Sequence, residues 1–234
     1  MALVVEKINV NYGKSKVVNG ASLTIEQGEK IALLGRNGVG KTTLLKGIMG
    51  VLPIEGSGKL SIDGTDLTKK SAHIHNLAGI GYVPQGREII PDLTVKENIE
   101  LGGLGHKEVD MKKQYEKVLS YFPALKPHLN RPGGVLSGGQ QQQLAIARCL
   151  MGAPKIVLLD EPTEGIQPNV VFEIAGIINA ISKEMGLSVI VVEQNLKFAR
   201  RVADRFLIMQ KGEIVCAGSM DELTDEVGKK YLSV

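Results

Sequence analysis

Short apolar, strand-like runs alternate with glycine-containing turns over roughly the first sixty residues of the chain. Turn residues such as Asn19-Gly20 and Gln27-Gly28 separate these runs, a pattern that is typical of strands joined by tight turns. The runs cover residues 3–8, 21–25, 30–34 and 59–62. We therefore predict an antiparallel β layer that packs on the core of the protein.

The pattern changes to helical spacing between residues 86 and 134. Two helices are predicted there, at 95–101 and 110–122, because prolines bound both segments and proline rarely continues a helix. These prolines are Pro91, Pro123, Pro127 and Pro132. The segment 86–134 is expected to be a helical subdomain, and residues 1–85 and 135–234 are expected to form the core with its β layer.

The second half of the chain alternates helices and strands. Helices are predicted at 138–151 and 170–185, and apolar strands at 156–159 and 189–192. In the second helix apolar residues recur at spacings of three and four, which marks a buried face: Val171, Ile174, Ile178, Ile181 and Met185. Alternation of this kind predicts an α/β fold with a parallel sheet, and 234 residues suffice for a single domain with one sizeable core.

Charge and hydropathy narrow the possible partners. The formal net charge is only +3, and no long block of like charges occurs, so we do not expect a nucleic acid to be the main partner. No apolar stretch approaches the roughly 20 residues that span a bilayer, and a signal peptide is not expected. Any role at a membrane is therefore expected to depend on another protein.

Cysteine and histidine give no metal-binding pattern. Cys149 and Cys216 are far apart in sequence and have apolar neighbours, so we expect buried thiols rather than a disulfide or a metal pair. The histidines lack the spacing of a zinc site and are expected at the surface: His73, His75, His106 and His128.

A glycine-rich string follows the predicted strand at 30–34 and precedes a predicted helix at 42–49. It fits G-x-x-x-x-G-K-[ST], in which bare amides wrap phosphates, the lysine reaches the β and γ oxygens, and the hydroxyl holds Mg²⁺. A strand, a glycine loop and a helix N-terminus form an anion site, whereas a turn without a ligand is the alternative. The predicted phosphate-binding residues are Gly35, Arg36, Asn37, Gly38, Val39, Gly40, Lys41, Thr42 and Thr43.

Two carboxylates end the apolar strand at 156–159. Ligands of open α/β sheets bind at the carboxyl ends of strands, so Asp160 is a candidate for holding Mg²⁺ or its water. Glu161 is a candidate base for an attacking water. A strand end with acidic loop residues is the alternative, which the glycine-rich string in the same chain disfavours.

A second pair of glycines precedes the predicted helix at 138–151. Ser137 is a candidate N-cap, and Gly138 and Gly139 leave the first amides of the helix uncovered, which favours an anion there. Gln140 completes this segment, residues 137–140. Its spacing alone does not say which molecule would supply the phosphate.

Taken together, these motifs resemble the ATP-binding cassette (ABC) ATPases over essentially the whole chain. The resemblance rests on the P-loop, on Gln85 after Tyr82-Val83-Pro84, on the string Leu136-Ser137-Gly138-Gly139-Gln140, and on Asp160-Glu161. It implies a P-loop NTPase (RecA-like) core that uses ATP and Mg²⁺. It also implies a second ATPase subunit, paired head to tail, so that residues 137–140 of one subunit contact the γ-phosphate held by the other.

The resemblance also assigns roles to single residues. Tyr12 matches the aromatic residue that stacks on adenine, although an ordinary turn tyrosine is the alternative. Gln85 would contact Mg²⁺ or the lytic water, and Glu161 and Lys41 would act in catalysis. The subunit would lie on the cytoplasmic side of the membrane, bound to permease subunits that receive solute from a binding protein.

Two positions depart from the general family pattern. Gln194 stands where most members have a switch histidine, so any contact with the γ-phosphate there must come from a neutral amide. Gln167, in Glu164-Gly165-Ile166-Gln167, stands where most members have an aspartate. Whether these glutamines support full-rate hydrolysis stays open.

Both departures resemble one branch of the family, the ATPases of uptake systems for branched-chain amino acids and for urea or short amides. The run from Val83 to Pro91 and Arg36 in the P-loop resemble the urea type more, so urea or a short amide is the expected solute. Branched-chain amino acid import is the alternative. Non-transport ABC ATPases, a nucleotide-gated module without hydrolysis and a lipid exporter subunit are further alternatives.

Overall fold

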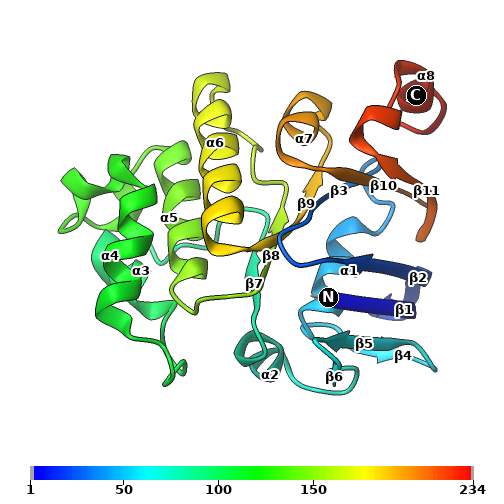
Figure 1. Ribbon diagram of the computed structural model, residues 1–234, viewed down its shortest axis with the longest axis horizontal. Helices are drawn as coiled ribbons and strands as arrows, with labels where there is room; N and C mark the ends of the chain where they lie inside the picture. Colours follow the sequence, from blue (N-terminus) through cyan, green and yellow to red (C-terminus); the bar gives the residue numbers. More distant parts are fainter. Residues whose placement is uncertain (1–2, 233–234) are drawn as a thin grey trace.

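An antiparallel sheet at one end of the molecule and a group of helices at the other flank a second, mainly parallel sheet (Figure 1). The computed structural model describes residues 3–232. In the antiparallel sheet the strand order is β2-β1-β5-β6, and β4 pairs with β1. These strands are β1 (Leu3–Tyr12), β2 (Ser15–Ile25), β4 (Ile54–Glu55), β5 (Lys59–Ile62) and β6 (Thr65–Asp66). The predicted β layer is confirmed.

The first hairpin turns at a different place from the predicted one. Strands β1 and β2 meet at residues 13–14, where the chain forms a turn, and Asn19-Gly20 lies inside β2. The register shifts between the pairs Ile8↔Ala21 and Val10↔Val18, and Gly20 has a φ of +60°. The predicted turn at Asn19-Gly20 is therefore wrong, because the glycine serves a bulge within a long strand.

The second sheet carries the functional edge of the protein. Its strand order is β11-β10-β3-β9-β8-β7, and all neighbouring pairs are parallel except β10 with β11. The strands are β3 (Lys30–Leu34), β7 (Ile80–Val83), β8 (Ile156–Asp160), β9 (Ser188–Glu193), β10 (Arg205–Gln210) and β11 (Glu213–Ser219). The chain thus has the predicted α/β fold, and four parallel strands, β3, β9, β8 and β7, end side by side.

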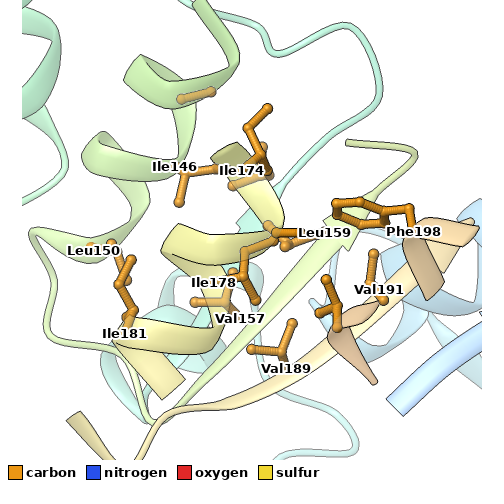
Figure 2. Packing of buried hydrophobic residues seen from close by; sticks show 14 of the residues in the cluster. Ile146, Leu150, Val157, Leu159, Ile174, Ile178, Ile181, Val189, Val191 and Phe198 are labelled. Atoms are coloured by element: carbon orange, nitrogen blue, oxygen red, sulfur yellow. The ribbon is translucent and has the colours of Figure 1, made fainter. Parts of the chain in front are cut away.

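The central strands are buried on both faces, which explains their uniformly apolar sequences. On one face they pack against helices, as Figure 2 shows for Val157, Leu159, Val189 and Val191 against Ile174, Ile178 and Ile181 of α6. On the other face the alternate residues Leu158, Ile190 and Val192 join a second cluster, shared with α1 (Lys41–Ile48) and the antiparallel sheet. Helix α1 is therefore fixed between the two sheets.

Helices cover the first of these faces. They are α5 (Gly138–Leu150), α6 (Pro168–Met185) and α7 (Leu196–Val202), while α2 (Ala72–Leu77) and α8 (Asp225–Tyr231) lie at the periphery (Figure 1). The region 86–134 contributes α3 (Val95–Leu101), α4 (Met111–Tyr121) and short 3₁₀ helices at Pro123–His128 and Gly133–Val135. A capping box of Thr94 and Glu97 starts α3.

The helical region is continuous with the main core. Val95, Ile99, Val118 and Phe122 belong to the same apolar cluster as α5 and α6. The boundaries 86 and 134 remain a prediction. Within residues 3–232, no helix is both long and apolar enough to cross a bilayer.

One histidine is not at the surface. His75 is only 1% exposed, and its ring nitrogens lie 2.8 Å from the carbonyl oxygens of Ile48 and Leu67. The prediction for His75 was wrong because the fold encloses its ring between these two carbonyls, at the end of α1 and before α2, and so gives a buried imidazole a hydrogen-bond acceptor. Cys149 and Cys216 are free and partly buried, and burial raises the pKa of the Cys149 thiol to about 12.

Candidate functional site

A cleft of about 540 Å³ opens where four parallel strands end. The segments after β3, β9, β8 and β7 meet there, together with the start of α1, because these strands are neighbours in the sheet. The lining residues are Val17, Asn37, Gly38, Gly40, Lys41, Thr42, Thr43, Gln85, Glu161, Thr163, Glu164, Glu193, Gln194 and Asn195. Polar groups from four separate segments, 37–43, 85, 161–164 and 193–195, therefore converge on one space.

The P-loop between β3 and α1 requires glycine at two places. Gly35 has a φ of +154°, and a Cβ on it would lie 2.5 Å from the carbonyl oxygen of Met209. Gly40 has a φ of +109° and lies against Val17. Gly40 is also the N-cap of α1 and offers no side-chain cap, so the first amides of this helix face the cleft without a side-chain acceptor. This arrangement is suited to phosphate oxygens.

Lys41 lies at the floor of the cleft, where carbonyl oxygens of the P-loop hold its ammonium group. It is 5% exposed, and its Nζ donates to the carbonyl oxygens of Gly35 at 2.8 Å and Arg36 at 3.0 Å. Burial lowers the pKa of Lys41, and the charge of Glu161, 3.8 Å from Nζ, opposes that shift. The loop carbonyls thus aim an ammonium group at the space that a phosphate would fill.

Asp160 and Thr42 form an oxygen pair beside the lysine. Thr42 Oγ1 donates to Asp160 Oδ1 at 3.1 Å, and the Tyr82 hydroxyl donates to Oδ2 at 3.2 Å. Asp160 is 1% exposed, and burial raises its pKa although both hydrogen bonds act in the opposite direction. In the described part of the chain no group of three or more His, Cys, Asp or Glu could hold a metal. A hydroxyl and a carboxylate nevertheless suit Mg²⁺, which binds through few protein oxygens when phosphates are present.

Glu161 is the centre of a hydrogen-bond network. Its Oε1 accepts from Gln194 Nε2 at 3.0 Å, and its Oε2 accepts from Gln85 Nε2 at 3.3 Å. Its backbone has a φ of +48°, which is unusual for a residue with a side chain and is typical of strained functional positions. The side chain of Glu161 is therefore oriented by two neutral amides and lies near one cation.

Gln194 connects the P-loop to the carboxylate. Its Nε2 also donates to Asn37 Oδ1 at 2.6 Å, so one amide group bridges Asn37 and Glu161. The structure thus brings together Lys41, Thr42, Gln85, Asp160, Glu161 and Gln194, which were singled out from the sequence.

Glu193 is a buried carboxylate that sequence reasoning did not select. It is 3% exposed and accepts hydrogen bonds from the backbone amides of Thr163 at 3.1 Å, and of Gln194 and Asn195 at 3.2 Å. Burial raises its pKa, against the effect of these donors. Glu193 joins the turn after β8 to the turn after β9, and so fixes Gln194 relative to Glu161. The sequence did carry a signal for Glu193, because it ends an apolar strand as Asp160 does.

The second glycine segment, residues 137–140, is not part of this cleft. None of its residues is among the described residues that line the cleft, and Ser137 is exposed. Ser137 Oγ accepts from the Gln140 amide at 3.3 Å, and Gln140 Oε1 accepts from the Ser137 amide at 3.1 Å, a capping box that starts α5. Tyr12, at the end of β1, is 62% exposed and also lies outside the described lining.

Comparison with known proteins places the chain in a family. The family model described as "ABC transporter" matches residues 18–164. The branched-chain amino acid transport ATP-binding protein BraG of Pseudomonas aeruginosa is 39% identical over 210 residues, which cover 90% of this chain and 89% of BraG. The probable branched-chain amino acid transport ATP-binding protein LivF of Archaeoglobus fulgidus is 30% identical, with 94% and 92% covered. The glutamine transport ATP-binding protein GlnQ of Geobacillus stearothermophilus is 35% identical, with 97% and 96% covered.

Solved structures agree with the sequence comparison. An ATP-binding cassette of an ABC transporter in its ADP conformation has a TM-score of 0.84 at 27% identity, with 94% of this chain and 92% of that chain covered. A dimeric cassette in a post-hydrolysis state, bound to ADP and Pi, has a TM-score of 0.82 at 26% identity, with 93% and 98% covered. The predicted P-loop NTPase fold is thereby confirmed, and the chain belongs to the ABC transporter family as an ATP-binding subunit with ATPase activity.

Proposed function

We propose that this protein hydrolyses ATP to power the import of a small solute through a membrane permease. The observation that carries the proposal is the position of Glu161. Its carboxylate lies 3.8 Å from the ammonium of Lys41 and accepts hydrogen bonds from Gln85 and Gln194 at the mouth of the P-loop. A base, a cation and two orienting amides are the groups that water attack on a γ-phosphate requires.

The P-loop binds the phosphates of ATP. The backbone amides of residues 35–43 surround the β- and γ-phosphates, and the Lys41 ammonium exchanges its contacts with the loop carbonyls for phosphate oxygens. The exposed ring of Tyr12 stacks on the adenine. Thr42 and Asp160, with Gln85 from the neighbouring strand end, would hold Mg²⁺, which neutralises part of the phosphate charge when bound.

Glu161 acts as the base. Gln85 and Gln194 hold its two carboxylate oxygens, so the carboxylate is fixed when a water molecule lies between it and the γ-phosphate. Gln194 donates its amide hydrogens to phosphate or to Glu161, so a neutral amide donor takes the place of the histidine common in the family. Glu193 keeps the Gln194 backbone in place through its three amide contacts.

A second ATPase subunit completes each site. Ser137, Gly138, Gly139 and Gln140 lie outside the cleft of their own subunit, so we assign them to the ATP of a partner paired head to tail. Each ATP then contacts both subunits and favours the closed pair through its difference in affinity for the open and closed states. The partner is either a second copy or a related ATPase.

The permease gives the subunit its place on the cytoplasmic side of the membrane. BraG and LivF support a branched-chain amino acid as the solute, whereas the run from Val83 to Pro91 and Arg36 support urea or a short amide. A binding protein would deliver the solute to the permease. We propose that the solute belongs to one of these two groups, with urea or a short amide retained as the prediction from the motifs.

Reconstitution tests this function directly. The purified subunit should release phosphate in a Mg²⁺-dependent manner, and its turnover in proteoliposomes with the co-purified permease should rise when a solute-loaded binding protein is added. Urea, short amides and branched-chain amino acids should each be supplied with the matching binding protein. Tight ATP binding without any phosphate release would contradict the proposal, and failure to co-purify with a permease would favour a non-transport ATPase.

A further inference from the structure

Arg87 links three segments that the proposed function assigns to the nucleotide. Its Nη2 donates to the carbonyl oxygen of Glu164 at 3.2 Å, and its Nη1 donates to Gln141 Oε1 at 3.4 Å. Glu164 follows Glu161 by three residues, and Gln141 lies in the first turn of α5. One guanidinium therefore ties the loop after Gln85 to the loop after Glu161 and to the helix that begins at residues 137–140.

The backbone that carries Arg87 is strained and is held by α5 in turn. Gly86, Arg87 and Glu88 have φ angles of +82°, +71° and +46°, three successive residues in the left-handed region. Arg148 of α5 donates from Nη2 to the carbonyl oxygens of Arg87 at 3.3 Å and Glu88 at 2.7 Å. Arg148 thus binds the backbone of the loop, and Arg87 of the loop binds Gln141 of α5. Such strain persists only where the surrounding contacts over-determine it.

The charge of Arg87 is unfavourable for α5 itself. The guanidinium lies over Gly138, where a Cβ would be 3.2 Å from Nη1. A helix N-terminus carries a partial positive charge, so a cation beside it destabilises the helix and an anion stabilises it. The arginine and the helix end both favour an anion at the same place, which matches a phosphate supplied from outside the subunit.

We infer that Arg87 is a positioning residue that fixes residues 137–140 relative to the loop after Glu161. It thereby sets how well this segment meets the γ-phosphate of ATP bound by the partner subunit. Because each subunit uses its own Arg87 to orient the segment that it offers to its partner, loss of the side chain affects pairing rather than nucleotide binding by one subunit. The inference rests on the proposed function, since it requires a partner's ATP.

The test measures pairing and nucleotide binding separately in a Glu161→Gln background, in which ATP is bound without turnover. Dimer formation with ATP and Mg²⁺ is followed by sedimentation velocity, and monomer affinity by titration of a fluorescent ATP analogue at low protein concentration. Arg87→Ala should weaken the ATP-dependent dimer by about tenfold or more, because hydrogen bonds from a charged group are lost. Monomer affinity should stay within about twofold. Lys117→Ala, an exposed position on α4, is the matched control and should change neither quantity.

Arg87→Lys keeps the charge and the fold but cannot make both contacts from one planar group. We expect it to weaken the dimer by less than Arg87→Ala, and it replaces that variant if the alanine protein does not fold. A dimer unaffected by either substitution would overturn the inference alone, as would equal losses of pairing and monomer affinity. Failure of the Glu161→Gln protein with Arg87 intact to pair on ATP would instead overturn the proposed function.

Discussion

The P-loop and residues 137–140 both place glycines at the start of a helix, but the two helix ends differ. Gly40 caps α1 without a side-chain hydrogen bond, so the amides of that helix are open towards the cleft. Ser137 and Gln140 cap α5 reciprocally. The carboxylates of Asp160 and Glu161 lie beside the P-loop, next to Thr42 and Lys41 respectively, whereas residues 137–140 lie outside the cleft.

Under the proposed function, this difference separates the part of the ATP site that one subunit builds alone from the part that a partner supplies. The P-loop, Gln85, Glu161 and Gln194 come together at four neighbouring strand ends in a single chain. Ser137 and Gln140 cap each other at the start of α5, and under the proposed function residues 137–140 meet a ligand that a partner subunit presents. Substitutions in the two regions should therefore separate nucleotide binding from turnover.

The largest effect is expected at Glu161. Glu161→Gln keeps the shape of the side chain but cannot accept a proton, so turnover should fall by about 10²- to 10⁴-fold while ATP affinity is retained. Phosphate release and equilibrium nucleotide binding measure the two quantities. Normal turnover in this variant would exclude Glu161 as the base. The cleft would then no longer differ from residues 137–140 by holding the group that activates water.

Lys41→Ala tests the grip of the P-loop. Loss of a charged hydrogen-bond donor should weaken ATP binding by the isolated subunit by roughly 10- to 100-fold, and calorimetric titration of the monomer measures this. Lys59→Ala, exposed on β5, removes the same charge far from the P-loop and should bind ATP normally. Unchanged affinity in Lys41→Ala would show that the P-loop does not bind the phosphates.

Ser137→Ala tests the other region. Monomer affinity for ATP should not change, turnover should fall by about tenfold because a donor to the partner's phosphate is lost, and stability should fall by about 1 kcal/mol with the helix cap. Phosphate release, monomer titration and denaturant unfolding measure these effects, with Ser120→Ala on α4 as the control. A loss of monomer affinity would contradict the assignment of residues 137–140 to a partner's nucleotide.

The smallest effect is expected at Tyr12. Aromatic stacking contributes about 0.5–1.5 kcal/mol, so Tyr12→Ala should weaken ATP binding by roughly 2- to 10-fold, and Tyr12→Phe should bind as the parent does. The measurement is again monomer titration. If Tyr12→Ala has no effect, the tyrosine is an ordinary residue at the end of β1.

The sequence predicted features that depend on neighbouring residues and failed where contacts between distant segments decide. Strands and helices with strong local patterns, such as β3, α3 and α6, lie within two residues of their predicted bounds. The turn at Asn19-Gly20 was wrong because pairing with β1 extends β2 past the glycine. His75 was misplaced because its two carbonyl partners come from Ile48 and Leu67, which the sequence pattern does not bring together.

The sequence by itself determined the phosphate loop and the α/β class, because a strand, a glycine loop and a helix start are encoded within some twenty adjacent residues. It also marked Asp160 and Glu161 at the end of an apolar strand. Only the tertiary structure decided that Gln85, Glu161 and Gln194 share one hydrogen-bond network, that Glu193 joins the turns after β8 and β9, and that Arg87 contacts the Glu164 carbonyl. The physical reason is the strand order β3-β9-β8-β7, which differs from the order along the chain and so brings distant residues to one edge.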